Sequence, residues 1–227
     1  MMCSGWRCAG VLMAVCMAAG AMALARAGDQ PDKKQDKGAA PKLDAKQEAE
    51  MKAWLALAEP GPHQKYLQQF VGDWKATTKM WQGPGTEPEV SEARMTGTMI
   101  LGGRHLIQEF HSTLMGMPFE GRGTMSYDNI TKKYQSTWMD TMTTGMSYST
   151  GSGDAAGKVF TFLGEMTEPS GKVSKTREVL TVTDANSHSM VFYVVGEDGK
   201  EWKNMEIVYT RAGAAPASGD AHGAKPK

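Results

Sequence analysis

The segment HSMVFYVVGEDGKEWKNMEIVYTR, residues 188–211, decides the fold of the chain. Apolar and polar residues alternate on both sides of Glu197-Asp198-Gly199-Lys200, a run that is typical of a tight turn. Two alternating strands joined by so short a turn form an antiparallel hairpin. The segment therefore predicts strands over residues 188–195 and 202–211.

The same pattern extends back along the chain to residue 73. Thr, Val, Tyr, Phe, Trp and Met alternate with polar residues, and turn residues recur about every ten positions. Short antiparallel strands without an intervening helix form a sandwich or an up-and-down barrel, and closure into a barrel removes the exposed sheet edges. We therefore expect an all-β barrel domain over residues 72–211, with about ten antiparallel strands in up-and-down order. The eight strands before the hairpin are expected near residues 73–82, 90–101, 104–113, 120–128, 132–140, 144–150, 158–165 and 172–183.

Residues 43–71 predict one or two helices before the barrel. The first part, up to Ala58, lacks Gly and Pro and is rich in Ala, Lys, Glu and Leu, a composition typical of helices. Pro60-Gly61-Pro62 ends this helix, and a second short helix is expected to follow it. One apolar face of the first helix is predicted from helical spacing, and it comprises Met51, Trp54, Leu55 and Ala58.

The N-terminus predicts export. Between Arg7 and Arg26 lie 18 uncharged residues rich in Ala, Met, Val and Leu, and small residues follow them. This arrangement is typical of a secretory signal peptide. We place it at residues 1–27, with cleavage after Ala27 or, as the alternative, after Ala25. An apolar stretch of this length just reaches the span of a membrane helix, so a retained anchor is the competing interpretation.

Cleavage would make the protein periplasmic or secreted, without stable membrane insertion. A disordered leader over residues 28–42 and a disordered tail over residues 212–227 are expected, because both lack large apolar residues. The three cysteines, Cys3, Cys8 and Cys16, all fall in the predicted signal peptide. The mature chain would then contain no disulfide and no thiolate nucleophile.

The charge balance argues against a nucleic-acid partner. The chain has 25 Lys and Arg residues against 25 Asp and Glu residues, and removal of Arg7 and Arg26 would leave a slight acidic excess. Nucleic-acid-binding proteins show a basic excess or a basic stripe instead. The sequence leaves the oligomeric state open.

Two short motifs resemble those of lipocalins and related calycins. Gly72-Asp73-Trp74 resembles the Gly-x-Trp signature at the start of the first strand, and Arg211 ends the last strand. The resemblance implies a calycin-like barrel in which Trp74 packs under Arg211 at the closed end.

A wider resemblance covers about residues 51–211. The chain resembles the bacterial, uncharacterised domain-of-unknown-function family 1579, for which no activity is established. A calycin-like barrel is the implied fold. The motifs that carry this resemblance are Pro60-Gly61-Pro62-His63, Val71-Gly72-Asp73-Trp74, Leu101-Gly102-Gly103-Arg104, Gly116-Met117-Pro118-Phe119-Glu120-Gly121, Tyr127-Asp128-Asn129, Gly145, Thr137-Trp138-Met139-Asp140, Asp198-Gly199-Lys200-Glu201 and Tyr209-Thr210-Arg211.

Charged residues interrupt several predicted strands and are the first candidates for a site. In a barrel interior they would need partners or a polar ligand, because burial of an unpaired charge is costly. Trp138 and Asp140 share one strand face and suit a polar organic ligand, although a packing pair explains them equally well. The other strand residues considered for ligand binding are Arg104, Glu109, His111 and Arg177.

The segment Met115–Gly121 is a further candidate. Its Met, Pro, Phe and Gly residues stand where a turn is ordinarily polar, which suggests the mouth or lid of a cavity with Met117 and Phe119 touching the ligand. Phe119 could instead plug the core.

The leading prediction is an exported, non-catalytic barrel that binds a small, partly apolar molecule, with no cofactor and no metal. One alternative is a barrel enzyme that uses Glu109 or Asp140 with Arg104 or Arg177 as a buried acid/base pair. Another is a metal or heme carrier, because single histidines and many methionines can serve as ligands. The glycines at positions 151, 153 and 157 are read as a turn.

Overall fold

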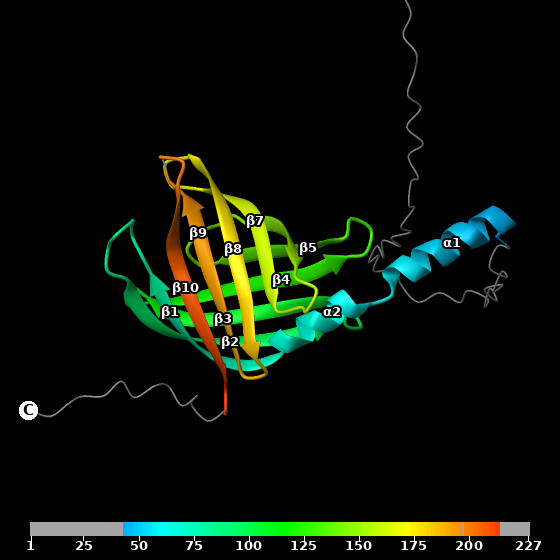
Figure 1. Cartoon of the computed structure of the whole chain (residues 1–227), viewed down its shortest axis with the longest axis horizontal. Coiled ribbons are helices and arrows are strands. Elements are labelled where there is room, and N and C mark those ends of the chain that lie inside the picture. The colour runs from blue at the N-terminus through cyan, green and yellow to red at the C-terminus, as the bar shows by residue number, and fades with distance from the viewer. Residues whose placement is uncertain (1–42, 197, 214–227) are drawn as a thin grey trace, which may run out of the picture. The chain divides into compact units, whose positions relative to one another are not determined.

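The computed structural model describes residues 43–196 and 198–213, and these residues form a closed antiparallel β-barrel preceded by helices (Figure 1). The predicted signal peptide, the predicted leader and residues 214–227 of the predicted tail lie outside the described residues. The helices are α1 (Ala45–Ala58), α2 (Pro62–Leu67) and the short 3₁₀ helix η1 (Gln68–Phe70). The strands are β1 (Gly72–Met80), β2 (Glu89–Ile100), β3 (His105–Leu114), β4 (Met117–Asp128), β5 (Lys133–Asp140), β6 (Ser147–Gly153), β7 (Val159–Thr167), β8 (Val173–Asp184), β9 (Ser187–Val195) and β10 (Glu201–Arg211).

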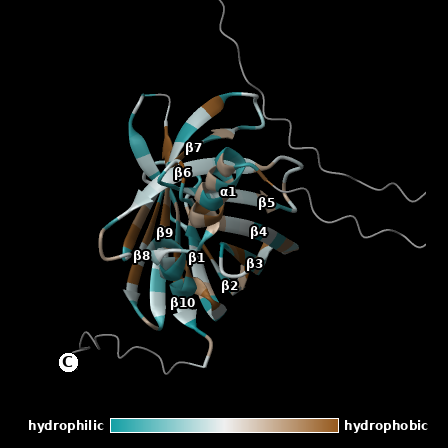
Figure 2. Ribbon diagram, turned by 90° about the vertical axis from the view of Figure 1, so that its right-hand side faces the viewer, coloured by the Kyte–Doolittle hydropathy of each residue, from teal (hydrophilic) through white to brown (hydrophobic). Residues whose placement is uncertain are grey.

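The predicted up-and-down barrel is confirmed. Each strand pairs with the next in the sequence, and β1 pairs with β10 to close the sheet. Hydrophilic and hydrophobic residues are interspersed along the strands (Figure 2), as expected for a wall with one inward and one outward face. Because the order is up-and-down, the β1–β2, β3–β4, β5–β6, β7–β8 and β9–β10 turns all lie at one end of the barrel. We call that end the mouth.

The opposite, closed end is plugged by α2 and η1. Leu67 and Phe70 from these helices are fully buried and join a core cluster with residues from β3, β4, β5, β7 and β8. The η1 backbone lies directly on the barrel wall at Gly97, where a β-carbon would come within 2.1 Å of the Phe70 carbonyl oxygen. Glycine is therefore required at this position for the plug to seat.

The predicted pairing of Trp74 with Arg211 is present at this closed end. The Arg211 guanidinium carbon lies 4.1 Å from the centroid of the Trp74 ring, and the two residues are register partners in β1 and β10. Arg211 also donates hydrogen bonds to the backbone carbonyls of Val71 and Ala185. The calycin-like arrangement implied by the sequence thus exists in the structure.

The predicted first helix is present as α1, but its apolar face is not buried. Asp44 and Gln47 form a capping box at its start. Trp54 and Leu55 are 63% and 59% exposed, and no residue of α1 is buried. No helix of the described chain is both long and apolar enough to span a membrane.

Two strand predictions are corrected, one at the mouth and one at the closed end. β4 begins at Met117 rather than at residue 120, because Met115 and Gly116 alone form the turn, both with positive φ. Gly151 and Gly153, predicted to lie in a turn, belong to β6, and only Gly157 lies in the turn that follows. A β-carbon at Gly151 would meet the Thr161 carbonyl oxygen at 2.1 Å, so this glycine serves close strand packing rather than a turn.

Candidate functional site

The alternation of burial along β8 shows which residues face the barrel interior. Ser174, Thr176, Leu180 and Val182 are buried, and every second residue between them is more exposed. Side chains of one parity share one face of a strand. Glu178 has the parity of the buried residues and therefore points into the lumen.

The closed half of the barrel is filled by side chains. One buried cluster surrounds Leu67 and Phe70, and a second runs from Trp74 toward the mouth, where Phe119 and Trp138 pack against its Phe110. A filled interior of this kind stabilises the barrel and leaves no space for a ligand. The second cluster comprises Trp74, Ala76, Ala93, Met95, Phe110, Ile207 and Tyr209.

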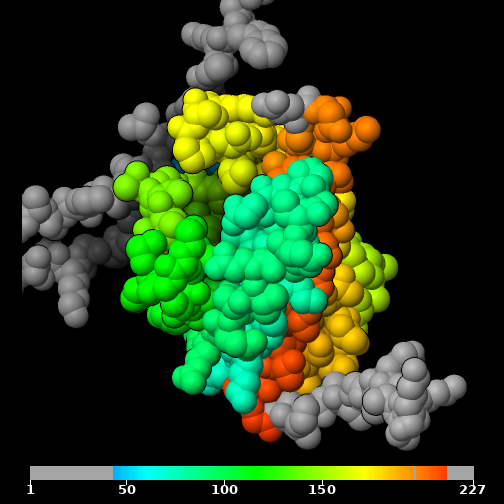
Figure 3. Space-filling view, turned by 90° about the vertical axis from the view of Figure 1, so that its left-hand side faces the viewer, coloured from blue at the N-terminus to red at the C-terminus, as the bar shows by residue number. Residues whose placement is uncertain are grey.

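The half of the lumen nearer the mouth is lined differently. On β4 to β7 its inward positions include the small residues Gly121, Ser136, Ser149 and Gly164. All four are only half-buried although they face inward, so the interior is open at this end. Figure 3, which looks at the side of the mouth, shows a recess between the yellow segment at the β7–β8 turn and the teal segment at the β1–β2 turn.

Trp138 lies flat on this inner wall. Gly121 and Gly123 of β4 stand opposite it, and a β-carbon on Gly121 would come within 2.3 Å of the indole. The indole Nε1 donates a 2.8 Å hydrogen bond to Oδ2 of Asp140, whose Oδ1 accepts from the Met142 backbone nitrogen at 3.0 Å. The two glycines thus leave room for a large aromatic surface along the wall, and Asp140 fixes its orientation.

Glu178 is the unusual group of the lumen. Its register partners are Phe162 on β7 and Phe192 on β9, and within the described residues it has no hydrogen-bond or ion-pair partner. Burial raises the pKa of the Glu178 carboxyl to about 7. Glu178 is nevertheless half-buried by surface area, and the accessible part faces the lumen rather than the outer surface. An unpaired carboxyl in an apolar recess is a typical feature of a binding site.

Four of the candidate residues lie outside the lumen. Glu109 forms an ion pair with Arg122 on the outer wall, and Arg177 pairs with Glu201 at 2.6 Å and stacks on Tyr193. His111 is exposed on β3, and Arg104 lies in the β2–β3 turn. These residues therefore do not converge with Asp140, and the acid/base pairs considered from the sequence do not share a cavity.

The remaining two candidates lie at the mouth. Phe119 faces inward, is partly buried and packs edge-to-face with Phe110 at 6.1 Å between ring centroids. Met117 is 52% exposed next to the β3–β4 turn. Of the predicted ligand-binding residues, Phe119, Trp138 and Asp140 thus share the mouth half of the lumen, and Met117 lies at its rim.

A family model matches the barrel and the helix before it. The match covers residues 59–211, and the family is described as proteins of unknown function, DUF1579. The chain belongs to the DUF1579 family. No match to a curated protein was found.

The solved structures similar to the DUF1579 chain include the following three. The crystal structure of Rv2717c from M. tuberculosis is 12% identical, covers 67% of this chain and 99% of its own, and has a TM-score of 0.50. A redesigned β-barrel is 12% identical, covers 64% of this chain and 94% of its own, and has a TM-score of 0.36. A de novo designed fluorescence-activating β-barrel is 15% identical, covers 64% and 95%, and has a TM-score of 0.34. The likeness to the M. tuberculosis protein supports the barrel fold alone.

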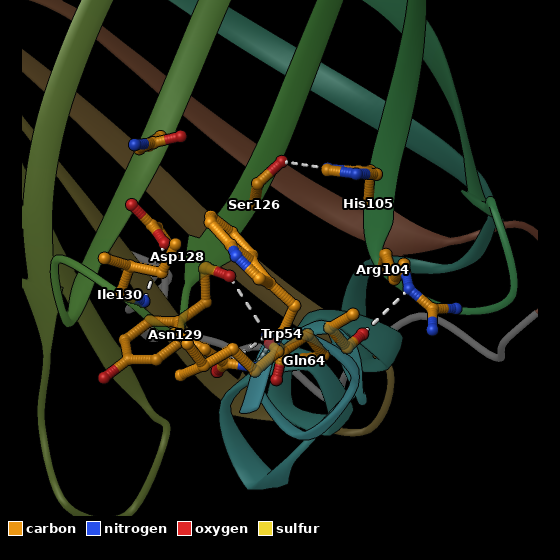
Figure 4. A pocket seen from close by; sticks show the side chains of 12 residues that line it. Trp54, Gln64, Arg104, His105, Ser126, Asp128, Asn129 and Ile130 are labelled. Carbon is orange, nitrogen blue, oxygen red and sulfur yellow. Dashed lines mark hydrogen bonds between the residues drawn. The ribbon is translucent and has the colours of Figure 1, made fainter. Parts of the chain in front are cut away.

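A second hollow, of about 300 Å³, lies outside the DUF1579 barrel between its closed end and α1 (Figure 4). Arg104 donates a hydrogen bond to the Ala58 carbonyl, and Asn129 donates to the Leu57 and Glu59 carbonyls, so these contacts hold the end of α1. His105 and Ser126 hydrogen-bond at 2.6 Å across its floor. The polar groups here mostly bind the protein's own backbone and neighbouring side chains.

The described residues of the DUF1579 protein contain no group of three or more His, Cys, Asp or Glu that could hold a metal ion. The buried histidine is His188, which the sequence did not single out. It stacks on Tyr209 at 4.3 Å and lies edge-on to Trp74 and Phe70. Both of its ring nitrogens lack a hydrogen-bond partner. Aromatic rings surround it closely, which favours a packing role.

Sequence reasoning also missed Glu178. In the run Thr176-Arg177-Glu178-Val179-Leu180 both strand faces carry apolar and charged residues, so the inward face is not evident. The register of β8 with Phe162 and Phe192 would have identified it, because directly opposed residues point to the same side.

Proposed function

We propose that the protein is exported and that its barrel binds a small, partly apolar molecule without catalysing a reaction on it. The molecule would occupy the mouth half of the lumen. The observation that carries this proposal is the unpaired Glu178 carboxyl beside an inner wall of small residues.

The lining of the recess supports a ligand with both apolar and polar parts. Trp138, Phe119 and Phe192 offer aromatic surface, and the small residues Ser136, Ser149 and Gly164 on the same inner wall fill little of the lumen. Small-molecule sites in proteins typically combine an apolar wall with a few polar groups, and the mouths of barrels are common places for them. In the acid/base pairs considered from the sequence, Glu109 and Arg177 lie on the outer wall and are paired with other residues, away from Asp140, so these pairs do not support catalysis.

The Ser149→Phe variant tests the site. Ser149 faces the lumen, so a phenyl group there would fill the recess, and we expect it to weaken binding of a neutral solvatochromic naphthalene dye at least about tenfold. The matched control is Thr150→Phe, which places the same ring on the outer wall of the same strand and should bind the dye like the wild type. Dye fluorescence titrations give both affinities, and circular dichroism checks the fold. Equal dye binding by the two variants would contradict the proposal.

Export is tested by sequencing the N-terminus of the protein recovered from its host. We expect a periplasmic or secreted chain that begins at Gly28 or, with the alternative cleavage site, at Arg26. A chain that keeps residues 1–27 and sediments with membranes would support the anchor instead.

A further inference from the structure

The charged side chains that face the mouth half of the lumen are all acidic. At strand positions of inward parity the charged residues are Glu178, Asp140 and, at the rim, Glu89, and none in this half is Lys or Arg. Arg211 has inward parity but lies at the closed end, where it covers Trp74 and binds backbone carbonyls. An anionic ligand would therefore meet repulsion in the recess, and a cationic one would meet attraction.

Of these acids, Glu178 lies inside the lumen and is free to bind a ligand. Both oxygens of Asp140 accept hydrogen bonds from Trp138 and Met142, whereas the Glu178 carboxyl has no such partner within the described residues. Glu178 also lies between the register partners Phe162 and Phe192. Phe162 is fully buried, so the ring that a ligand can reach beside the carboxylate is that of Phe192. A carboxylate beside an aromatic ring attracts ammonium groups through both its charge and the ring face.

We propose that the lumen accepts an organic cation, with an apolar or aromatic body along Trp138 and an ammonium group against Glu178. This inference rests on the proposed binding function and names the class of its ligand. A cation beside Glu178 removes the cost of an unpaired buried carboxylate, since each charge then compensates the other. The same interaction would favour the ionised form of a carboxyl that burial otherwise keeps largely protonated near neutral pH.

Three probes of similar shape separate the cation from other ligands. They are 2-phenylethylamine, 2-phenylethanol and 3-phenylpropanoate, titrated by calorimetry into the full mature chain at pH 7.5. We expect the amine to bind at least about tenfold more tightly than the alcohol, and the carboxylate to bind most weakly.

The Glu178→Gln variant locates the interaction. It keeps the size and polarity of the side chain and removes its charge, so we expect amine affinity to fall at least about tenfold, to the level of the alcohol, while alcohol affinity stays the same. The control Glu165→Gln removes an exposed carboxyl on the outer face of the neighbouring strand and should leave all three affinities unchanged.

Two results would overturn the inference. One is an amine that binds no more tightly than the alcohol, or not at all, in a protein that still binds the neutral naphthalene dye. The other is an amine whose affinity survives Glu178→Gln. The first leaves the proposed binding function standing, because the dye carries no charge. The proposed binding function itself would be wrong if the wild type does not bind the dye, or if Ser149→Phe does not weaken dye binding.

Discussion

As the pH falls from 8 to 5, the unfolding free energy of the His188→Leu variant is expected to rise by about 2 kcal/mol relative to that of the wild type. Burial, with a smaller contribution from the positive charge of Arg211, lowers the pKa of His188 to about 3. The unfolded chain protonates this histidine below about pH 6.5, whereas the folded chain does not. In this window the unfolded state therefore binds more protons, and His188 destabilises the wild type as the pH falls.

Leucine removes this effect, because it has no group to titrate and is of similar size. It also removes the two unpaired ring nitrogens, which offsets some of the lost ring contacts with Tyr209 and Trp74. The predicted quantity is therefore the change in unfolding free energy with pH, and not its value at a single pH. Urea denaturation at pH 8, 6.5 and 5 measures it for the wild type and for each variant.

His111→Leu is the control for this experiment. His111 is exposed on the outer wall of β3, so the variant should follow the wild type within about 0.5 kcal/mol at every pH. Three carboxyls, Asp128, Asp154 and Glu201, have pKa values lowered by hydrogen bonds and stay ionised throughout this window. Parallel pH profiles for the wild type and His188→Leu would show that the buried histidine takes up a proton in the folded state.

The barrel could be predicted from the sequence because its signals are local. The turn residues and the alternation along 188–211 give strand ends within a residue or so of β9 and β10. These features depend on backbone geometry and on neighbours close in the chain. The pairing of Trp74 with Arg211 joins the first and last strands, and it was implied by the resemblance to calycins rather than by a local signal.

The site was harder to predict because it depends on strand parity across the sheet. Glu109, His111 and Arg177 interrupt their strands, but a shift of one residue in parity moves each of them from the lumen to the outer wall. Trp138 and Asp140 could be proposed together because residues two apart share one strand face, and the structure places both on the inner wall. Glu178 was missed because an acid between Arg177 and Val179 looks like a surface residue until its register with two phenylalanines is known.

The Glu178→Gln variant should be more stable than the wild type at pH 8, by about 3 kcal/mol at most, and nearly equal to it at pH 4. Burial raises the pKa of Glu178 to about 7, so the folded state keeps the proton while the unfolded state releases it above about pH 4.5. The folded wild type thus loses stability as the pH rises from 4.5 to 7. Glutamine has no proton to lose and removes this penalty.

The neighbours of Glu178 do not change the sign of this prediction. The titratable group that interacts with it is Tyr209, whose pKa is raised by burial and by the negative charge of Glu178. Tyr209 therefore stays neutral throughout the range, and the remaining partners across the sheet, Phe162 and Phe192, do not titrate. Urea denaturation at pH 4, 6 and 8 measures the difference, with Glu165→Gln as the exposed control.

His188 and Glu178 act in opposite directions between pH 5 and pH 8. The histidine destabilises the fold as the pH falls, and the glutamate destabilises it as the pH rises, by similar amounts of about 2 to 3 kcal/mol. We therefore expect a nearly flat stability profile for the wild type, which His188→Leu tilts toward acid stability and Glu178→Gln toward alkaline stability. A Glu178→Gln profile parallel to that of the wild type would mean that the carboxyl is already ionised and solvated in the folded wild type. A saturating amine ligand should raise the unfolding free energy of the wild type at pH 8 toward that of Glu178→Gln, because the ammonium charge compensates the buried carboxylate.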